Sequence, residues 1–212
     1  MILGLDVSTT KIGAAVLSDP VEFIKTVNGK STSYFRRELL MSECWDLDTK
    51  IYPDIEDKME VVMAELSTVR SKYNITEVFI EEHIKGVNRK AGRNNIQILL
   101  KLAKFNGLVC WGCYDMFGFK AKTVNPIKAR KSYGISFANT VRSPERKKII
   151  TKTVIETEGN KFEWSYNRNG VNYATGTEDR ADAVVTARYG EYLIKTENDK
   201  PFLEKMDYIG NE

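Results

Sequence analysis

The sequence predicts an α/β protein with one mixed five-stranded sheet, three antiparallel strands followed by parallel ones, and helices on both faces. Two apolar runs at the start, residues 2–7 and 12–17, flank a short polar turn and predict a pair of buried antiparallel strands. Further along, short apolar strands alternate with long amphipathic segments, which is typical of parallel strands joined by helices. With 212 residues, of which 42% are hydrophobic, the chain is long enough to form one well-developed core.

The next part of the chain predicts a third strand, an irregular region and a helix. Residues 21–27 form the expected strand, and Asn28-Gly29 is typical of the hairpin turn that would end it. Residues 34–52 mix aromatic and charged side chains, and we expect an insertion there with a short helix over 36–41. A clear helix follows over 53–73, because acids fill its first turn and apolar residues recur at helical spacing.

The middle of the chain predicts two further strands and two helices. A short buried strand over 76–83 ends in acidic residues, and a long helix with a wide apolar face covers residues 95 to about 116. Residues 119–124 predict the last strand, and Asn125 and Pro126 start a short basic helix.

The C-terminal part predicts two helices joined by a hairpin. Ser143 and Pro144 begin a basic helix that ends near residue 156, and residues 158–177 form an exposed hairpin. A helix rich in alanine and valine starts at Thr177 and should pack tightly on the sheet. We expect one domain over residues 1–196 with insertions near 34–52 and 158–177, and a loosely ordered tail over 197–212.

Bulk composition limits the compartment. The chain has no apolar run of 18 residues and no leader with a cleavage site, so we expect a soluble, cytoplasmic protein that is not secreted and does not contact membranes. Cys44, Cys110 and Cys113 are an odd number without framework spacing, which fits a reducing compartment. Cys110 and Cys113 form a C-x-x-C that could be half a zinc site or a redox pair, but buried thiols packing a helix are the favoured interpretation.

Basic residues concentrate in one stretch. The net charge is only +3, yet residues 120–152 carry ten lysines and arginines against one acid, Glu145. Such a block in a nearly neutral protein predicts a surface for a polyanion, with an ordinary solvated helix face as the alternative. The loop over 85–95 contains glycines and cations, as expected of a segment that closes over a phosphate backbone.

Two carboxylates come at the ends of buried strands. Asp6 could cap its turn by accepting hydrogen bonds from the amides of Ser8 and Thr9, or it could meet a metal ion or a phosphate. Glu81 ends a second strand, and parallel strands place their carboxyl ends on the same edge of a sheet. Strand alternation puts only one of Glu81 and Glu82 on the face of the site. The two acids therefore predict a shared site at that edge.

A second pair of acids begins the last helix. Asp179 and Asp182 are three residues apart, so both point from the same side of the helix start, and Asp182 stands among alanines and valines. Four like charges in one place raise each other's pKa unless cations intervene. Hard oxygen ligands without histidine or thiolate select Mg²⁺, with Mn²⁺ as a substitute, and two such ions can assist hydrolysis of a phosphodiester.

The chain resembles a RuvC-type Holliday junction resolvase of the RNase H-like superfamily. The matching motifs are residues 2–13 around Asp6, residues 78–82 around Glu81, and Asp179-Arg180-Ala181-Asp182-Ala183, in this order and spacing. The resemblance implies that Asp6, Glu81, Asp179 and Asp182 are catalytic metal ligands for two Mg²⁺ ions. It further implies a homodimer that cuts two opposed strands of a four-way DNA junction. The two insertions favour a phage or viral branch, in a bacterial cell or an infected host.

Three positions bear on how closely the chain follows that pattern. Ser8 stands where the family has glycine, and Ile84 stands where it often has an aromatic residue that wedges into the junction. His83, the only histidine, could approach the scissile phosphate or be structural. Candidate DNA contacts to the phosphate backbone come from the polar turn, the glycine-rich loop and the short basic helix: Lys11, Lys85, Arg89, Lys90, Arg93, Lys128 and Lys131.

Other functions remain possible on the same fold. A nuclease for flaps, other branched DNA or RNA-DNA hybrids keeps the chemistry and changes the substrate. An actin-like ATPase or sugar kinase would use residues 6–10 as a phosphate loop, but the chain is about half the needed length and does not repeat this motif. A non-catalytic DNA-binding module of this fold would have no use for four acids.

Overall fold

The computed structural model describes residues 1–27, 30–82, 93–138 and 140–209, and its centre is a five-stranded sheet in the order β3-β2-β1-β4-β5. Strands β1 to β3 are antiparallel neighbours, and β4 and β5 are parallel to β1, so the predicted mixed sheet is confirmed. The strands are β1 (Ile2–Val7), β2 (Lys11–Val27), β3 (Lys30–Asp46), β4 (Glu77–Glu81) and β5 (Lys122–Val124).

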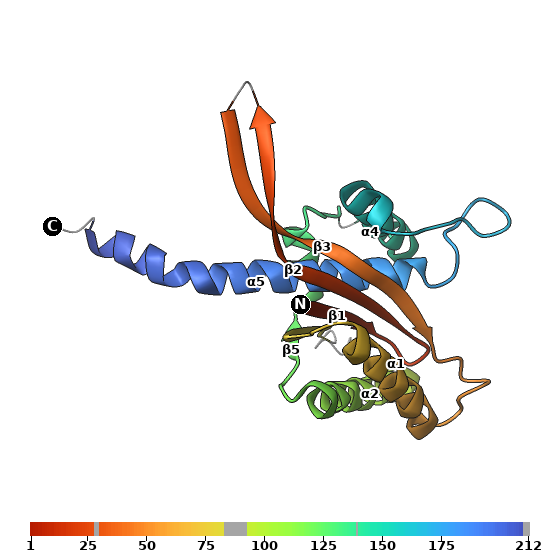
Figure 1. Ribbon diagram of the computed structural model, residues 1–212. Coiled ribbons are helices and arrows are strands. Elements are labelled where there is room, and N and C mark those ends of the chain that lie inside the picture. The colour runs from red at the N-terminus through yellow and green to blue at the C-terminus, as the bar shows by residue number, and fades with distance from the viewer. Residues whose placement is uncertain (28–29, 83–92, 139, 210–212) are drawn as a thin grey trace.

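Helices cover both faces of this sheet, as the sequence predicts. They are α1 (Ile55–Lys72), α2 (Arg93–Phe117), α3 (Pro126–Ser132), α4 (Ser143–Glu158) and α5 (Thr177–Ile209), with a short 3₁₀ turn η1 (Gly159–Lys161). Helices α1 and α2 lie below the sheet in Figure 1, and α5 crosses the opposite face together with α4. No helix within the described residues is both long and apolar enough to cross a membrane.

Alternation along β1 assigns its side chains to the two faces. Leu3 and Leu5 enter the core beneath α1 and α2, whereas Ile2 joins the core beneath α5. Gly4 and Asp6 therefore face α5. A Cβ on Gly4 would lie 2.6 Å from the backbone nitrogen of Ala187, so only glycine allows the helix to lie this close to the strand. The predicted tight packing of the alanine-rich helix is confirmed.

The second and third strands differ from the sequence prediction. Residues 11–27 form one long strand, interrupted by irregular pairing between Leu17 and Pro20, and not two strands. Residues 30–46 form its partner, so the short helix expected over 36–41 is wrong. The reason is that Lys11 to Val27 finds a cross-strand neighbour for nearly every residue in β3, and these pairs outweigh the local helical pattern. The Asn28-Gly29 turn lies outside the described residues.

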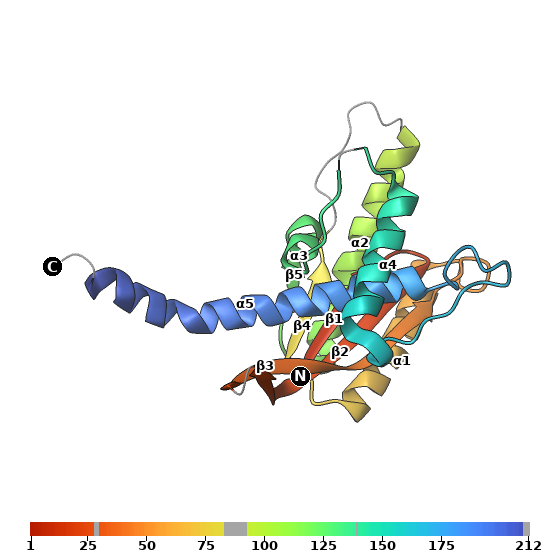
Figure 2. The same ribbon diagram turned by 90° about the horizontal axis from the view of Figure 1, so that it is seen from above.

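The long hairpin and the long helix both extend beyond the sheet. Figure 1 shows the tips of β2 and β3 standing above the rest of the molecule, and Figure 2 shows the C-terminal part of α5 reaching away from it. Helix α5 continues to Ile209, so the loosely ordered tail expected beyond Lys195 is wrong for residues up to 209. The limits of the domain and its insertions stay predictions.

Two smaller predictions are supported. The segment between η1 and α5 turns back on itself, with a single bridge between Tyr166 and Tyr173 and an aromatic cluster of these two rings and Trp164. Cys113 is buried in the core, Cys110 is half-buried, and both thiols are free, which agrees with a packing role. Burial raises the pKa of Cys113 to about 12, so the thiol is not activated.

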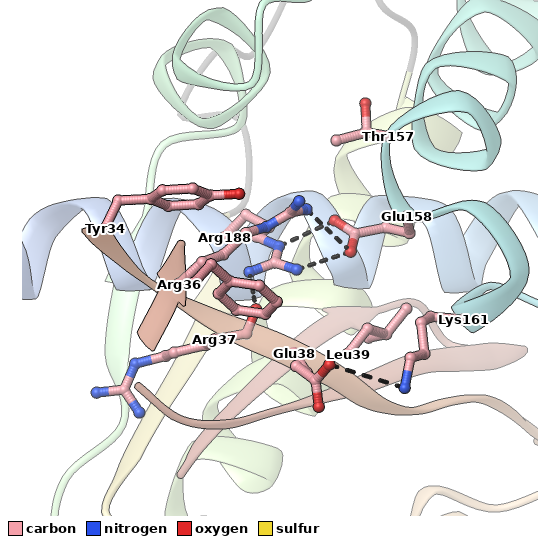
Figure 3. Close-up of a pocket in the computed structure, with 10 residues that line it drawn as sticks. Tyr34, Arg36, Arg37, Glu38, Leu39, Thr157, Glu158, Lys161 and Arg188 are labelled. Atoms are coloured by element: carbon pink, nitrogen blue, oxygen red, sulfur yellow. Dashed lines mark hydrogen bonds and ion pairs between the residues drawn. The ribbon is translucent and has the colours of Figure 1, made fainter. Parts of the chain in front are cut away.

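A buried ion network joins α4 to the middle of α5 (Figure 3). Arg188 donates from Nε and Nη2 to the two carboxylate oxygens of Glu158, at 2.9 and 2.7 Å, and Arg36 donates to Glu158 at 3.3 Å. Outside that view, Arg188 Nη1 donates to Glu191 at 2.8 Å, and Tyr133 donates to Glu158 at 2.9 Å. We call Arg36, Tyr133, Glu158, Arg188 and Glu191 the arginine network. It ties α4 and the end of α3 to α5, and these helices carry side chains of the site described next.

Candidate functional site

The parallel pairing of β1 with β4 brings two acids to the same edge of the sheet. Leu5 pairs with Ile80, and the next residue along each strand is an acid, Asp6 on β1 and Glu81 on β4. Phe79 lies in the core beneath α5, and alternation therefore puts Glu81 on the same face as Asp6. The sequence-based choice of Glu81 over Glu82 agrees with this geometry.

Gly13 brings the other two acids close. It pairs with Asp6 across β1 and β2, and a Cβ at this position would lie 2.0 Å from the carbonyl oxygen of Asp179. The first turn of α5 can approach the sheet here only because the side chain is missing. Asp182, one turn further along α5, is 4% exposed. All four predicted acids thus converge where β1, β4 and α5 meet, and we call them the acid cluster.

Ser8, and not Asp6, closes the turn after β1. The Ser8 hydroxyl donates to the carbonyl of Lys11 at 2.8 Å and accepts the amide of Lys11 at 3.0 Å. The Ser8 amide donates to the same carbonyl at 2.9 Å. The alternative in which Asp6 only caps its turn is therefore not what the structure shows. The serine that replaces the expected glycine supplies the cap, and the Asp6 carboxylate faces the other acids.

Two cations enter the acid cluster from α3 and α4. Arg130 donates to Asp182 at 3.2 Å and lies 3.6 Å from Glu81. Lys147 lies 3.7 Å from Asp179 and 3.9 Å from Glu178. Arg130 Nε is buried and has no hydrogen-bond partner within the described chain. Within the part of the chain that the structure describes, two cations therefore face four carboxylates.

The excess of carboxylates over cations among the described residues is reflected in the pKa values of the acids. Burial, followed by the charges of Asp182, Glu81 and Asp179, raises the pKa of Asp6 well above its ordinary value. Burial and the charge of Asp182 raise the pKa of Glu81 to about 7, although Arg130 opposes the shift. Burial also raises the pKa of Asp182 against the lowering effect of Arg130 and Lys147. Buried carboxylates that repel each other in this way favour any arrangement that brings in more positive charge.

The donor chemistry of the acid cluster fits a hard divalent cation. Its four acids offer carboxylate oxygens, which suit Mg²⁺ or Mn²⁺. Within the described ranges, no three His, Cys, Asp or Glu side chains are already close enough to hold one ion. The cations Arg130 and Lys147 occupy the acids instead, so the carboxylates would have to turn toward a metal ion as it binds.

The predicted DNA contacts are only partly described. Lys128 and Lys131 are exposed on α3, beside Arg130, and Lys11 is half-buried at the start of β2. Lys85, Arg89 and Lys90, together with His83 and Ile84, lie outside the described residues, and so does the side chain of Arg93 at the start of α2. Their role in DNA binding stays a prediction.

The sequence analysis missed Arg130 and Lys147 as members of the site, although it noted the basic block around them. Only their helical spacing from residues that the structure shows to be buried separates these two from their basic neighbours. Arg130 follows Pro126 by four residues and Pro126 is buried, so both lie on the inward face of α3. Lys147 precedes Ile150 and Thr151 by three and four residues, and these two are buried on α4. A cation on the inward face of an amphipathic helix requires a buried acid opposite it.

Comparison with known proteins finds similarity in structure only, because no family model matches and no curated protein matches in sequence. The structure of T. thermophilus RuvC in complex with a Holliday junction substrate matches with a TM-score of 0.55 at 15% identity, over 88% of this chain and 89% of that one. A second Thermus thermophilus RuvC structure gives 0.52 at 12% identity, over 91% of this chain and 95% of that one.

A third similar structure is more distant. The yeast mitochondrial Holliday junction resolvase Ydc2 matches with a TM-score of 0.43 at 14% identity, over 88% of this chain and 75% of that one. The two RuvC matches span nearly the whole of both chains. This chain therefore has the RNase H-like fold of RuvC.

Proposed function

We propose that this protein is a metal-dependent endonuclease that resolves four-way DNA junctions by hydrolysing phosphodiesters on opposed strands. The observation that carries the proposal is the acid cluster: four carboxylates, brought together by β1, β4 and α5, in which burial and the neighbouring carboxylates raise the pKa of Asp6, Glu81 and Asp182. A structure of the same fold, RuvC from T. thermophilus, was solved with a Holliday junction substrate, and this supports the choice of DNA. The proposed place of action is the cytoplasm of a bacterial or phage-infected cell.

Asp6, Glu81, Asp179 and Asp182 are the residues that would hold Mg²⁺ or Mn²⁺, with two ions expected. Bound ions of this kind activate a water molecule and stabilise the negative charge that develops on the cleaved phosphodiester. Arg130 and Lys147 pair with the acids in the metal-free protein. With a metal ion held by the acids, Arg130 and Lys147 would be free to hold the DNA phosphates beside the cut, and Lys11, Lys128 and Lys131 would position the strand further away.

Cutting two opposed strands requires two such sites, so we include a homodimer in the proposal. Helix α2 carries a suitable surface. Ile96, Leu100, Trp111 and Tyr114 are 41 to 64% exposed, and together with the exposed Ala103 they follow each other at helical spacing. This stripe points away from the side of α2 that is buried against the sheet. An apolar stripe of several helical turns is the surface that a second copy of the same helix can cover.

The proposal is tested by digesting a synthetic four-way junction and a linear duplex of the same sequence with the purified protein, with and without Mg²⁺. We expect symmetrical cuts in the junction, little cutting of the duplex, and no cutting without a divalent ion. Equal cutting of duplex and junction would contradict the junction assignment. A preference for flaps or for RNA-DNA hybrids would support the rival substrate classes.

The acid cluster is tested by Asp6→Asn in the same assay. Loss of a ligand should reduce cleavage by more than about 100-fold, since even residues that only orient metal ligands contribute 10 to 100-fold. Junction binding should remain measurable, because the amide keeps the shape of the side chain. The matched control is Glu56→Gln, which changes an exposed acid on α1, on the other face of the sheet. Retained cleavage in Asp6→Asn would remove Asp6 from the site.

A further inference from the structure

A cavity lies between α3, the segment that follows it, and the start of α4. Its lining residues are Ile127, Arg130, Lys131, Ile135, Ser136, Phe137 and Arg146. No acidic side chain is among these lining residues, whereas three of them are cations. The cavity therefore combines apolar and positively charged lining residues, which suits a ligand that has both a flat apolar part and a negative charge.

One wall of the cavity is a ready stacking surface. The guanidinium carbon of Arg146 lies 5.6 Å from the ring centroid of Phe137, and Arg146 Nε donates to the carbonyl of Val141 at 2.8 Å, which holds the guanidinium in place. Ile127, at 73% exposed, stands on α3 at the rim. Aromatic rings and guanidinium planes are the groups on which single-stranded nucleic acid bases stack, largely without regard to sequence.

The cavity adjoins the acid cluster through two shared elements. Arg130 lines the cavity and also donates to Asp182 at 3.2 Å. Arg146 lines the cavity, and the next residue, Lys147, lies 3.7 Å from Asp179. A DNA strand whose phosphate lies at the acids would therefore pass the cavity mouth within the reach of a neighbouring nucleotide.

We propose that this cavity binds one unpaired nucleotide of the DNA strand next to the phosphodiester that is cut. Its base stacks on Phe137 and contacts Ile127, and its phosphate lies against Lys131 and Arg146. The inference rests on the proposed nuclease function and extends it, because it assigns to α3 and the following segment the role of holding a base out of the helical stack. Nucleotides near a junction centre are more easily unstacked than those in a continuous duplex.

The experiment compares the affinity of the protein for a DNA strand with bases and for an abasic strand, and the ratio of the two affinities reports base binding. Fluorescently labelled oligothymidine of about ten nucleotides and an abasic strand of the same length are bound without divalent metal, so that no strand is cut. We expect the wild type to bind the strand with bases about tenfold more tightly, as stacking of one base allows. The same ratio is then measured with a four-way junction that carries an abasic position beside the cut.

Phe137→Leu and Ile127→Ala test the cavity itself. Phe137→Leu keeps an apolar side chain for the core but removes the aromatic face, and Ile127→Ala changes an exposed residue that packing does not need. Both variants should lower the ratio to about twofold while binding the abasic strand as the wild type does. The matched control Phe35→Leu, at an exposed aromatic on β3, should keep the full ratio.

The outcomes separate this inference from the proposed function. A wild type that shows no preference for bases, or variants that keep the full ratio on both DNAs, would overturn the cavity assignment even if junctions are cut. A ratio that falls in both cavity variants, in a protein that does not cut junctions, would confirm the cavity and remove only the proposed function.

Discussion

Helix α5 has buried charged side chains in two places, and neighbouring groups balance their charges in one place but not in the other. At Arg188, in the arginine network, Glu158 accepts hydrogen bonds from Arg188, Tyr133 and Arg36. Less than two turns earlier, at Asp182, the acid cluster gathers four carboxylates, and among the described residues Arg130 and Lys147 are the cations in ion pairs with them. Among the described residues, the buried charges around Arg188 are therefore balanced by neighbouring groups of opposite charge, whereas those around Asp182 are not.

The pKa values follow the same division. Burial alone would raise the pKa of Glu158, but the hydrogen bonds and charge of Arg188 outweigh it and hold that pKa below its ordinary value. In the acid cluster, burial and mutual repulsion raise the pKa of Asp6, Glu81 and Asp182. The fold can evidently neutralise a buried acid. Among the described residues the carboxylates of the acid cluster are not neutralised in this way, and perturbed pKa values of this kind are typical of functional sites such as the one proposed above.

The largest stability effect should come from breaking the arginine network. Arg188→Met keeps most of the apolar side-chain volume but leaves Glu158 buried without its main partner, so we expect a loss of about 3–5 kcal/mol in the free energy of unfolding. Urea unfolding at neutral pH measures it. The control Arg36→Gln changes a partner that is 41% exposed, and should cost at most about 1 kcal/mol. Equal losses of unfolding free energy in the two variants would show that Arg36 stabilises Glu158 as much as Arg188 does.

The next effect concerns a cation of the acid cluster. Lys147→Met removes a charge that lies against Asp179 and also acts on Asp182 and Asp6. If Lys147 turns to the DNA phosphates during the reaction, cleavage of a four-way junction should fall by about 10 to 100-fold at saturating Mg²⁺. Lys152→Met, which removes a 71% exposed lysine of the same helix, is the control and should cleave normally. Unchanged cleavage in Lys147→Met would limit Lys147 to a structural role.

The same substitution that stops cleavage should make the metal-free protein more stable. Asp6 makes no ion pair among the described residues and is repelled by three carboxylates, so Asp6→Asn relieves both repulsion and the cost of burial. A gain of about 1 kcal/mol would raise the melting temperature by roughly 2–4 °C. Differential scanning calorimetry without divalent ions measures this. A lower melting temperature would mean that the cluster is not under-compensated.

The smallest effect is a pH dependence confined to the arginine network. Because the folded-state pKa of Glu158 is lowered, the stability that its charge provides is present above the unfolded value of about 4.3 and is lost as the pH falls through the folded value. The difference in unfolding free energy between the wild type and Glu158→Gln should therefore shrink as the pH drops from 6 toward 3. A difference that is constant across this range would show that Glu158 contributes through packing alone.

Much of the fold could be predicted because its elements have strong local patterns. The apolar run over 2–7, the helical spacing over 55–72 and the alanine- and valine-rich start of α5 are strong local patterns, and the structure places these elements close to the expected limits. The partner strand β3 could not be predicted because aromatic and charged side chains are mixed over residues 34–52. Only the pairing of β2 with β3, with its irregularity near Pro20, makes this region a hairpin.

The residues of the candidate site also divide into those that the sequence predicts and those that only the structure identifies. Asp6, Glu81, Asp179 and Asp182 could be found in the sequence because acids within apolar segments are costly and therefore conspicuous. Arg130 and Lys147 could not be separated from their basic neighbours, because all ten cations between residues 120 and 152 have the same charge in the sequence. What distinguishes these two is the inward face of a helix, and that depends on how α3 and α4 pack against α5.

The sequence by itself determined the order of the elements, the chemistry of the acids and their place at strand and helix ends, because these depend on local periodicity and on the cost of burying charge. The tertiary structure alone decided which cations face the acids and how the arginine network compensates charge in the middle of α5. Both depend on distances between residues far apart in the chain, and such distances exist only once the helices have packed on the sheet.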